Sequence, residues 1–210
     1  MIAYLRLPPF IATLGMSTIV YGINSIYYNM EPNNAQPIGG IRPELTFLSQ
    51  YQVFGHVSLL VFIAALVTFL VWFLLNKTTY GKSIYAAGGN PVAAKISGVK
   101  VGLVLLSAYV IESLLVGLGG VLEVARNSGA NSVFGFSYEF DAISACVVGG
   151  VSLSGGVGKV SGVVIGVVIF NFISYGLTFI GIDPNWQMVV KGVIICMAVG
   201  LDVRKNIRAT

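Results

Sequence analysis

The run from Leu59 to Leu75 constrains the fold more than any other feature, because it holds 16 non-polar residues and one threonine. At 1.5 Å of rise per residue, roughly 20 apolar residues in a helix cross a hydrocarbon core of about 30 Å. Only 10% of the 210 residues are charged, against about a quarter in soluble domains. A chain of this length cannot surround several such helices with a polar shell, so we expect an integral membrane protein.

Apolar blocks of this kind recur along the chain and predict about six spans. The fourth block is unusual, because its apolar part, Ala142 to Val151, reaches only about 15 Å as a helix. It is expected to be a short or re-entrant helix, which is tolerated where protein or water shields the backbone. The predicted fold is an all-α, polytopic transmembrane helix bundle that forms one domain over residues 1–210. The spans lie at about residues 10–29, 57–75, 101–122, 139–153, 160–181 and 187–203.

The placement of the basic residues indicates the orientation of the chain. The loop of residues 76–100 contains four lysines and no acidic residue, and the C-terminal tail adds three basic residues. Cytoplasmic loops carry an excess of Lys and Arg, so both segments are predicted to be cytoplasmic. Six crossings counted back from the tail place the N-terminal segment, with Arg6, in the cytoplasm as well. The basic residues of the loop are Lys77, Lys82, Lys95 and Lys100, and those of the tail are Arg204, Lys205 and Arg208.

Several function classes find no support in the sequence. The glycine-rich run Gly149–Lys159 resembles a phosphate loop but has Leu153 and Val160 where that motif needs glycine and Ser or Thr. The single histidine, His56, offers neither a metal cluster nor a base beside a nucleophile. The 12 Lys and Arg residues are scattered rather than clustered among aromatics, which argues against nucleic-acid binding. We expect no catalytic residue, metal or cofactor.

A few polar side chains fall inside the spans. Glu112 lies near the middle of the third span, where an acidic residue costs about 2.5–3.5 kcal/mol unless it faces a wet cavity, a partner or is protonated. It either lines a path or is a protonated acid bonded to a neighbouring helix. Asn171, Ser174 and Tyr175 in the fifth span offer donors to a polar substrate or, alternatively, interhelical hydrogen bonds of about 1 kcal/mol or less. Lys191 is predicted to extend to the membrane surface.

The long basic loop contains signals for a short helix. Asn90 is a favoured N-cap, Pro91 suits the first helical position, and Gly98 suits the C-terminal stop. Val92 and Ile96 then lie one turn apart on one face. Such a helix is either a rigid knob that docks into a groove of another protein or an interfacial helix that closes the loop. Small side chains are expected to form a surface around Val92 and Ile96: Ala93, Ala94 and Ser97.

Several consecutive motifs carry a resemblance to a known family. They are Tyr80-Gly81-Lys82 through Ser97-Gly98-Val99, Gly119–Glu123, Tyr138–Ser152 and Ser154–Gly158, continuing through Asn171–Gly181 and from Trp186 to the end of the last span. Over essentially its whole length the chain resembles the permeases of ABC importers for ribose, galactose and xylose. The resemblance is greatest to the members that import galactose or methyl galactoside. It rests there on Cys146 before Val147–Gly150, on the region of Asn24 and Tyr27-Tyr28, and on Tyr175–Thr178.

The resemblance implies a mechanism and partners. In this family two permease subunits, here a homodimer, form the path in the bacterial inner membrane lipid, and a periplasmic binding protein delivers the sugar. A short coupling helix of each subunit rests in a groove of a cytoplasmic ABC ATPase. The resemblance assigns the coupling role to Gly88, Gly89, Asn90, Pro91, Ala93, Ala94, Ser97 and Gly98. The candidates for the substrate path are Glu112, Asn171, Ser174 and Tyr175.

Two departures from the family leave alternatives open. Met1 falls where the family's polypeptide is already well under way, so the chain is expected to be the C-terminal portion of the family's domain, either a fragment or a truncated product that inserts without assembling. Glu112 stands where a similar member has a small polar residue. An ion-coupled secondary transporter or channel could use Glu112 as its proton or cation site, but such proteins usually contain paired repeats with interrupted helices, which the sequence lacks.

Overall fold

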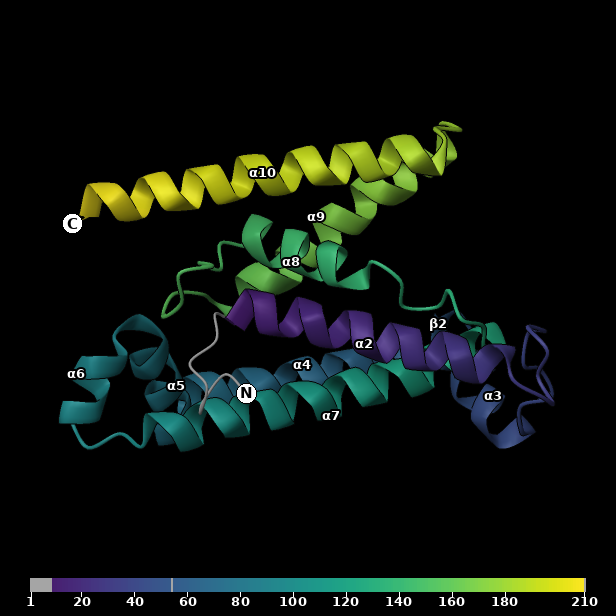
Figure 1. Cartoon of the computed structure of the whole chain (residues 1–210), viewed down its shortest axis with the longest axis horizontal. Helices are drawn as coiled ribbons and strands as arrows, with labels where there is room; N and C mark the ends of the chain where they lie inside the picture. The colour runs from purple at the N-terminus through teal and green to yellow at the C-terminus, as the bar shows by residue number, and fades with distance from the viewer. Residues whose placement is uncertain (1–8, 54, 210) are drawn as a thin grey trace. The chain divides into compact units, whose positions relative to one another are not determined.

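The computed structural model describes residues 9–53 and 55–209, and the regular secondary structure of the described chain is almost entirely helical (Figure 1). The only sheet among the described residues is a two-stranded antiparallel hairpin, which pairs Gln52 with Ser58 and Val53 with Val57. This confirms the all-α prediction. The elements are α2 (Pro9–Asn29), α3 (Pro43–Gln50), β1 (Gln52–Val53), β2 (Val57–Ser58), α4 (Leu59–Lys77), α5 (Thr79–Gly89), α6 (Pro91–Ile96), α7 (Val101–Asn127), α8 (Tyr138–Val148), α9 (Val160–Phe179) and α10 (Pro184–Ala209).

Each predicted span coincides with a helix, namely α2, α4, α7, α8, α9 and α10. Among the described residues, α4, α7 and α9 are long and apolar enough to cross a membrane. Their large apolar side chains are exposed rather than buried, for example Leu66, Leu114 and Val168. Apolar surface of this extent is rarely exposed by water-soluble monomers, and it suits contact with lipid. The transmembrane helix bundle is therefore confirmed.

The fourth span is short, as predicted, but its helix ends earlier than expected. Helix α8 has 11 residues and stops at Val148, where Gly149 and Gly150 follow and Gly150 takes a φ of +81°. A positive φ is readily adopted only by glycine. The chain then runs as a loop to the start of α9, so the last residues assigned to the span, 149–153, are not helical.

The contacts of the chain group it into two compact units, which are described separately. The first comprises Met1–Phe69 and Gly102–Gly135. Within it, the loop after α2 is attached to the end of α7, because Ile38 and Ala130 exchange two backbone hydrogen bonds of 2.9 Å. The hydroxyl of Ser49 on α3 also donates to the carbonyl of Ala125, at 2.8 Å.

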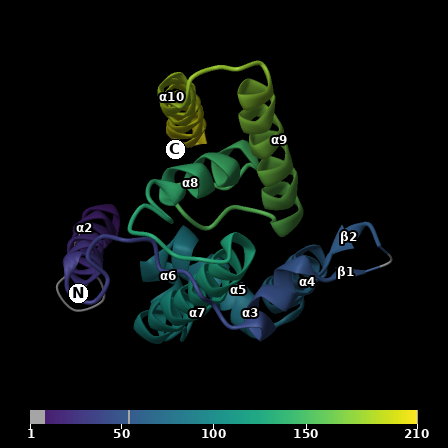
Figure 2. The same cartoon turned by 90° about the vertical axis from the view of Figure 1, so that its right-hand side faces the viewer.

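The second unit comprises Leu70–Val101 and Phe136–Thr210. Its helices α8 and α9 lie side by side, with α10 packed against α8 (Figures 1 and 2). Glycines allow the close approach of α8 and α9: a Cβ added at Gly149 would lie 2.5 Å from the carbonyl oxygen of Gly162, and one at Gly166 would collide with the carbonyl oxygen of Ala145. Small residues at helix interfaces are the usual means of packing in lipid.

Candidate functional site: a capped loop helix and a polar pocket

The short helix predicted in the basic loop exists as α6, and its N-terminus is capped as expected. The side chain of Asn90 accepts a hydrogen bond of 2.9 Å from the backbone N–H of Ala93, and Pro91 occupies the first turn. An Asn cap satisfies one of the N–H groups that a helix start leaves without a partner, and proline there loses no hydrogen bond.

The C-terminus of α6 is closed by the predicted glycine. Gly98 has a φ of +84°, which allows the chain to turn back on the helix. The N–H of Val99 then bonds to the carbonyl of Ala94 at 3.0 Å, and the N–H of Gly98 bonds to the carbonyl of Lys95 at 3.1 Å. This pair of bonds is a Schellman motif. Helix α6 is consequently held at both ends and forms a stiff unit of six residues.

The faces of α6 differ sharply in exposure. Ile96 is 83% exposed and Val92 is also exposed, whereas Ala94 is only 4% exposed. The expectation that Ala94 contributes to the accessible small-residue surface is therefore wrong, because its side chain lies inward. Ala93 and Ser97 remain on the exposed side, as expected. We call the set Val92, Ala93, Ile96 and Ser97 the exposed face of α6.

A second feature joins α5 to the loop that precedes α9. The backbone at Gly88 and Gly89 approaches the backbone at Gly155 and Gly156 so closely that no side chain fits between them. A Cβ added at Gly156 would lie 2.5 Å from the Cα of Gly89, and one at Gly155 would lie 2.6 Å from the carbonyl oxygen of Gly88. We call these four residues the glycine clasp.

The glycine clasp has a hydrogen bond beside it. The hydroxyl of Tyr85 on α5 donates to the carbonyl of Gly158 at 3.1 Å. Gly155 and Gly156 both have a positive φ, of +92° and +72°, so glycine is required there for backbone conformation as well as for space. The glycine-rich run that superficially resembled a phosphate loop thus has a structural role in this unit.

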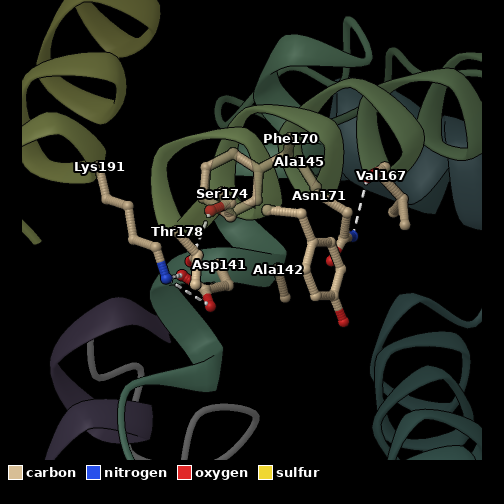
Figure 3. Close-up of a pocket in the computed structure, with 10 residues that line it drawn as sticks. Asp141, Ala142, Ala145, Val167, Phe170, Asn171, Ser174, Thr178 and Lys191 are labelled. Carbon is tan, nitrogen blue, oxygen red and sulfur yellow. Dashed lines mark hydrogen bonds and ion pairs between the residues drawn. The ribbon is translucent and has the colours of Figure 1, made fainter. Parts of the chain in front are cut away.

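A polar pocket of about 260 Å³ opens between α8, α9 and α10 (Figure 3). Its base is apolar and includes Phe170, which is almost fully buried. Ala142, Ala145 and Val167 complete the apolar part of the lining. The polar part of the lining consists of six side chains: Asp141, Asn171, Ser174, Tyr175, Thr178 and Lys191.

An ion pair lies at one side of the pocket. The Nζ of Lys191 is 2.7 Å from Oδ1 and 2.9 Å from Oδ2 of Asp141, and Figure 3 shows the two side chains pointing toward each other. The two side chains are 27% and 37% exposed. Nζ also lies 5.7 Å from the centre of the Phe170 ring, within the range of a cation–π contact. The prediction that Lys191 extends to the membrane surface did not include this partner, and it stays a prediction.

The pocket brings together three of the four candidates for the substrate path. Asn171, Ser174 and Tyr175 all line it. Glu112 is not among its lining residues, and it lies exposed on α7. Sequence reasoning missed Asp141, although an acidic residue in the first turn of a helix is a recognisable signal. Its partner stands 50 positions away, and nothing in the sequence links the two.

Neither feature is built to hold a metal. Among the described residues no group of three or more His, Cys, Asp or Glu side chains is arranged around a possible ion. The pocket offers one carboxylate, which is already paired with an ammonium group. Its chemistry is that of hydrogen bonding to a polar molecule.

Comparison with known proteins agrees with this arrangement. The galactose/methyl galactoside import permease of Escherichia coli (strain K12) is 52% identical over 99% of this chain and 62% of its own length. That of Haemophilus influenzae is 47% identical over 97% of this chain and 61% of its own length. The ribose import permease of Escherichia coli (strain K12) is 38% identical over 96% and 62%. The chain thus spans about three fifths of the length of these relatives.

A family model matches nearly the whole chain, while no solved structure matches it at a significant level. The relatives and the family model therefore confirm the resemblance that the motifs indicated. Residues 1–199 match the model described as "Branched-chain amino acid transport system / permease component", and the chain belongs to this family of transport permeases.

Proposed function

We propose that the chain is a permease subunit of an ATP-driven importer of a monosaccharide, galactose or methyl galactoside, in a bacterial inner membrane. The observation that carries the proposal is the 52% identity to a galactose/methyl galactoside import permease over 99% of the chain. The ribose permease is less similar, at 38% identity. The family's description names branched-chain amino acids, but these individual relatives carry the names of sugars.

The proposed contact with a cytoplasmic ABC ATPase is the exposed face of α6, together with Gly88–Pro91 and Gly98 that shape its ends. Two observations support it. An isoleucine that is 83% exposed on a basic loop suits a partner's groove better than water. The caps at both ends make α6 stiff, and a stiff element transmits a displacement that a flexible loop would absorb.

The glycine clasp supplies a route for that displacement within the second unit. A push on α6 moves α5, since only Asn90 separates them. The clasp and the bond from Tyr85 to Gly158 then carry the movement to the loop before α9. Because backbone touches backbone, little motion is lost to side-chain rotation. Helices α8 and α9, which hold the pocket, follow.

The remaining assignments rest on the charge pattern and on the relatives. Both termini and the loop of residues 76–100 are cytoplasmic in this proposal, and residues 1–210 act as one permease domain. A second copy of the permease completes the path, and a periplasmic binding protein delivers the sugar. The chain itself performs no chemistry on the sugar.

Transport by a defined complex tests the proposal. The chain is co-expressed with the ATPase and the binding protein encoded in its own genome, in bacteria that lack their own galactose permease, and uptake of labelled galactose and ribose is measured. We expect galactose uptake that is lost when the ATPase is inactivated. Uptake that depends on a proton gradient instead of ATP would make the chain a secondary transporter. A chain that inserts but never co-purifies with the ATPase would contradict the proposal and indicate a non-functional fragment.

A further inference from the structure

We propose that the polar pocket between α8, α9 and α10 is a contact site for the sugar in transit, in which the pair Asp141–Lys191 hydrogen-bonds the sugar hydroxyls. This inference rests on the proposed function and adds to it a location and two residues. Neither Asp141 nor Lys191 is among the candidates that the sequence suggested. Both line the pocket, where they form an ion pair at 2.7 Å.

The position of the pocket suits a first contact on the entry side. It is built from the first two turns of α8, the part of α9 from Val167 to Thr178 and the second turn of α10. In the proposed topology these three segments are the outer ends of their helices. A sugar released by a binding protein outside would therefore meet this pocket before it reached the deeper part of the path.

The hydrogen-bonding capacity of the pocket matches a polyol. A carboxylate has about four acceptor sites and an ammonium group has three donors, and the ion pair uses only two of each. Asn171 uses one N–H on the carbonyl of Val167, at 2.8 Å, which leaves its amide oxygen and a second N–H. Sugar hydroxyls both donate and accept, so they can use every one of these groups.

The charges of the pocket exclude an ionic ligand. Asp141 and Lys191 are the two charged side chains of the lining, and their charges cancel. A cation would have to displace the ammonium group, and an anion would have to displace the carboxylate. A neutral molecule needs to displace neither. The apolar base formed by Phe170 and Val167 complements the C–H face of a sugar ring, as is usual where a small number of polar groups orient a ligand above an apolar surface.

A transport site must also release its ligand, and this pocket is suited to weak binding. The ion pair is preformed, so the sugar gains hydrogen bonds to charged groups without separating them. The pocket is not enclosed. The hydroxyl of Thr178 is already engaged, since it donates to the carbonyl of Ser174 at 3.0 Å and accepts from the amide of Gln187 at 3.2 Å. Binding that is favourable enough for entry but weak enough for exit is a general requirement of conduction.

Protection of an introduced cysteine tests the inference without relying on transport. In a C146A/C196A background, T178C places a thiol in the pocket, and I180C places one on the exposed turn just beyond α9. The chain is purified in lipid nanodiscs and treated with a water-soluble thiol reagent. D-Galactose should slow modification of T178C, by about twofold at half occupancy, and leave I180C unchanged. Glycine betaine at the same concentration controls for osmotic effects.

The ion-pair variants show whether the pair contacts the sugar or only joins the helices. D141N keeps the shape of the side chain but removes its charge, so it should abolish the protection of T178C by galactose. The exchange D141K/K191D restores an ion pair and membrane yield but moves the carboxylate to α10 and the ammonium group to α8. A sugar held in one orientation by the native pair should then not be held, so protection should stay lost. The inference is overturned if galactose slows both cysteines equally or neither, if D141N keeps full protection, or if the exchange restores protection.

The result is separable from the proposed function. If the complex imports galactose with ATP but T178C is not protected, only the pocket assignment fails. If the complex neither assembles nor imports a sugar, the proposed function fails whatever the cysteines report.

Discussion

The hydroxyl of Tyr85 donates a 3.1 Å hydrogen bond to the carbonyl of Gly158, 73 positions along the chain. It joins the helix that precedes α6 to the loop that precedes α9. The bond lies beside the glycine clasp, where side chains are absent on both sides. One side-chain bond and one backbone contact therefore hold the same two segments, and they can be tested separately.

Replacing Tyr85 by Phe removes the hydrogen bond and keeps the ring. The expected loss of stability is about 1 kcal/mol, the usual net contribution of a single hydrogen bond. It should appear as a lower midpoint of denaturant unfolding in detergent, with normal membrane insertion. Ser83→Ala is the control, since the Ser83 hydroxyl bonds only within α5, to the carbonyl of Thr79 at 3.1 Å. Equal effects of both changes would show that the bond to Gly158 has no special role.

Replacing Gly156 by Ala should be far more severe. The added Cβ would lie 2.5 Å from the Cα of Gly89, at a φ of +72° that side chains rarely adopt. Either the clasp opens or the protein is lost from the membrane. We expect a fall in ATPase co-purification and in uptake that exceeds the effect of Tyr85→Phe. Gly117→Ala is the matched control, because nothing lies within 4 Å of its added Cβ. A fully active Gly156→Ala variant would show that the clasp carries no movement.

The periodic features of the chain were readable from the sequence, and its long-range pairings were not. The caps of α6 depend on neighbours, so Asn90, Pro91 and Gly98 predicted the helix correctly. The burial of Ala94 depends on what α6 packs against, which local pattern does not reveal. Likewise the pairing of Lys191 with Asp141 is not predictable from the sequence, because the two residues belong to different helices 50 positions apart. The clasp was recognised only as a glycine-rich run, since close packing in lipid leaves no mark beyond small residues.

The orientation of the chain is tested by accessibility of introduced cysteines. Gln36 and Lys100 are both exposed, and the proposed topology places Gln36 outside and Lys100 in the cytoplasm. In intact cells of the C146A/C196A background, a membrane-impermeant thiol reagent should label Gln36→Cys and spare Lys100→Cys until the cells are opened. Labelling of Lys100→Cys from outside would reverse the topology and remove α6 from the ATPase's side.

A substitution at Glu112 distinguishes an ATP-driven permease from an ion-coupled secondary transporter. Glu112 is not among the lining residues of the pocket, and it lies exposed on α7. Replacing it by Gln keeps the size and the hydrogen-bonding ability of the side chain and removes only the charge. We expect normal assembly and galactose uptake within about twofold of the unchanged protein, since surface substitutions usually shift free energies by less than about 0.5 kcal/mol. Loss of uptake with normal insertion would assign Glu112 to the path, and altered dependence on the proton gradient would favour secondary transport.

The exposed face of α6 gives the most direct test of ATPase docking. Replacing Ile96, which is 83% exposed, by Glu should leave the helix intact because both caps remain. It should still prevent entry into an apolar groove, since burying an unpaired carboxylate costs several kcal/mol. Co-purification of the ATPase and sugar-stimulated ATP hydrolysis should therefore both fall by at least about tenfold, as a loss of about 1.4 kcal/mol or more implies.

Two controls separate docking from folding. Thr79→Glu adds the same charge to an exposed residue of α5 outside the proposed contact and should be silent. Ala94→Arg places a large side chain where the residue is only 4% exposed, and should reduce the amount of folded protein rather than docking alone. If Ile96→Glu retained full ATPase binding and normal uptake, the docking assignment would be wrong. Helix α6 would then be an interfacial helix that closes the loop, the alternative that its sequence left open.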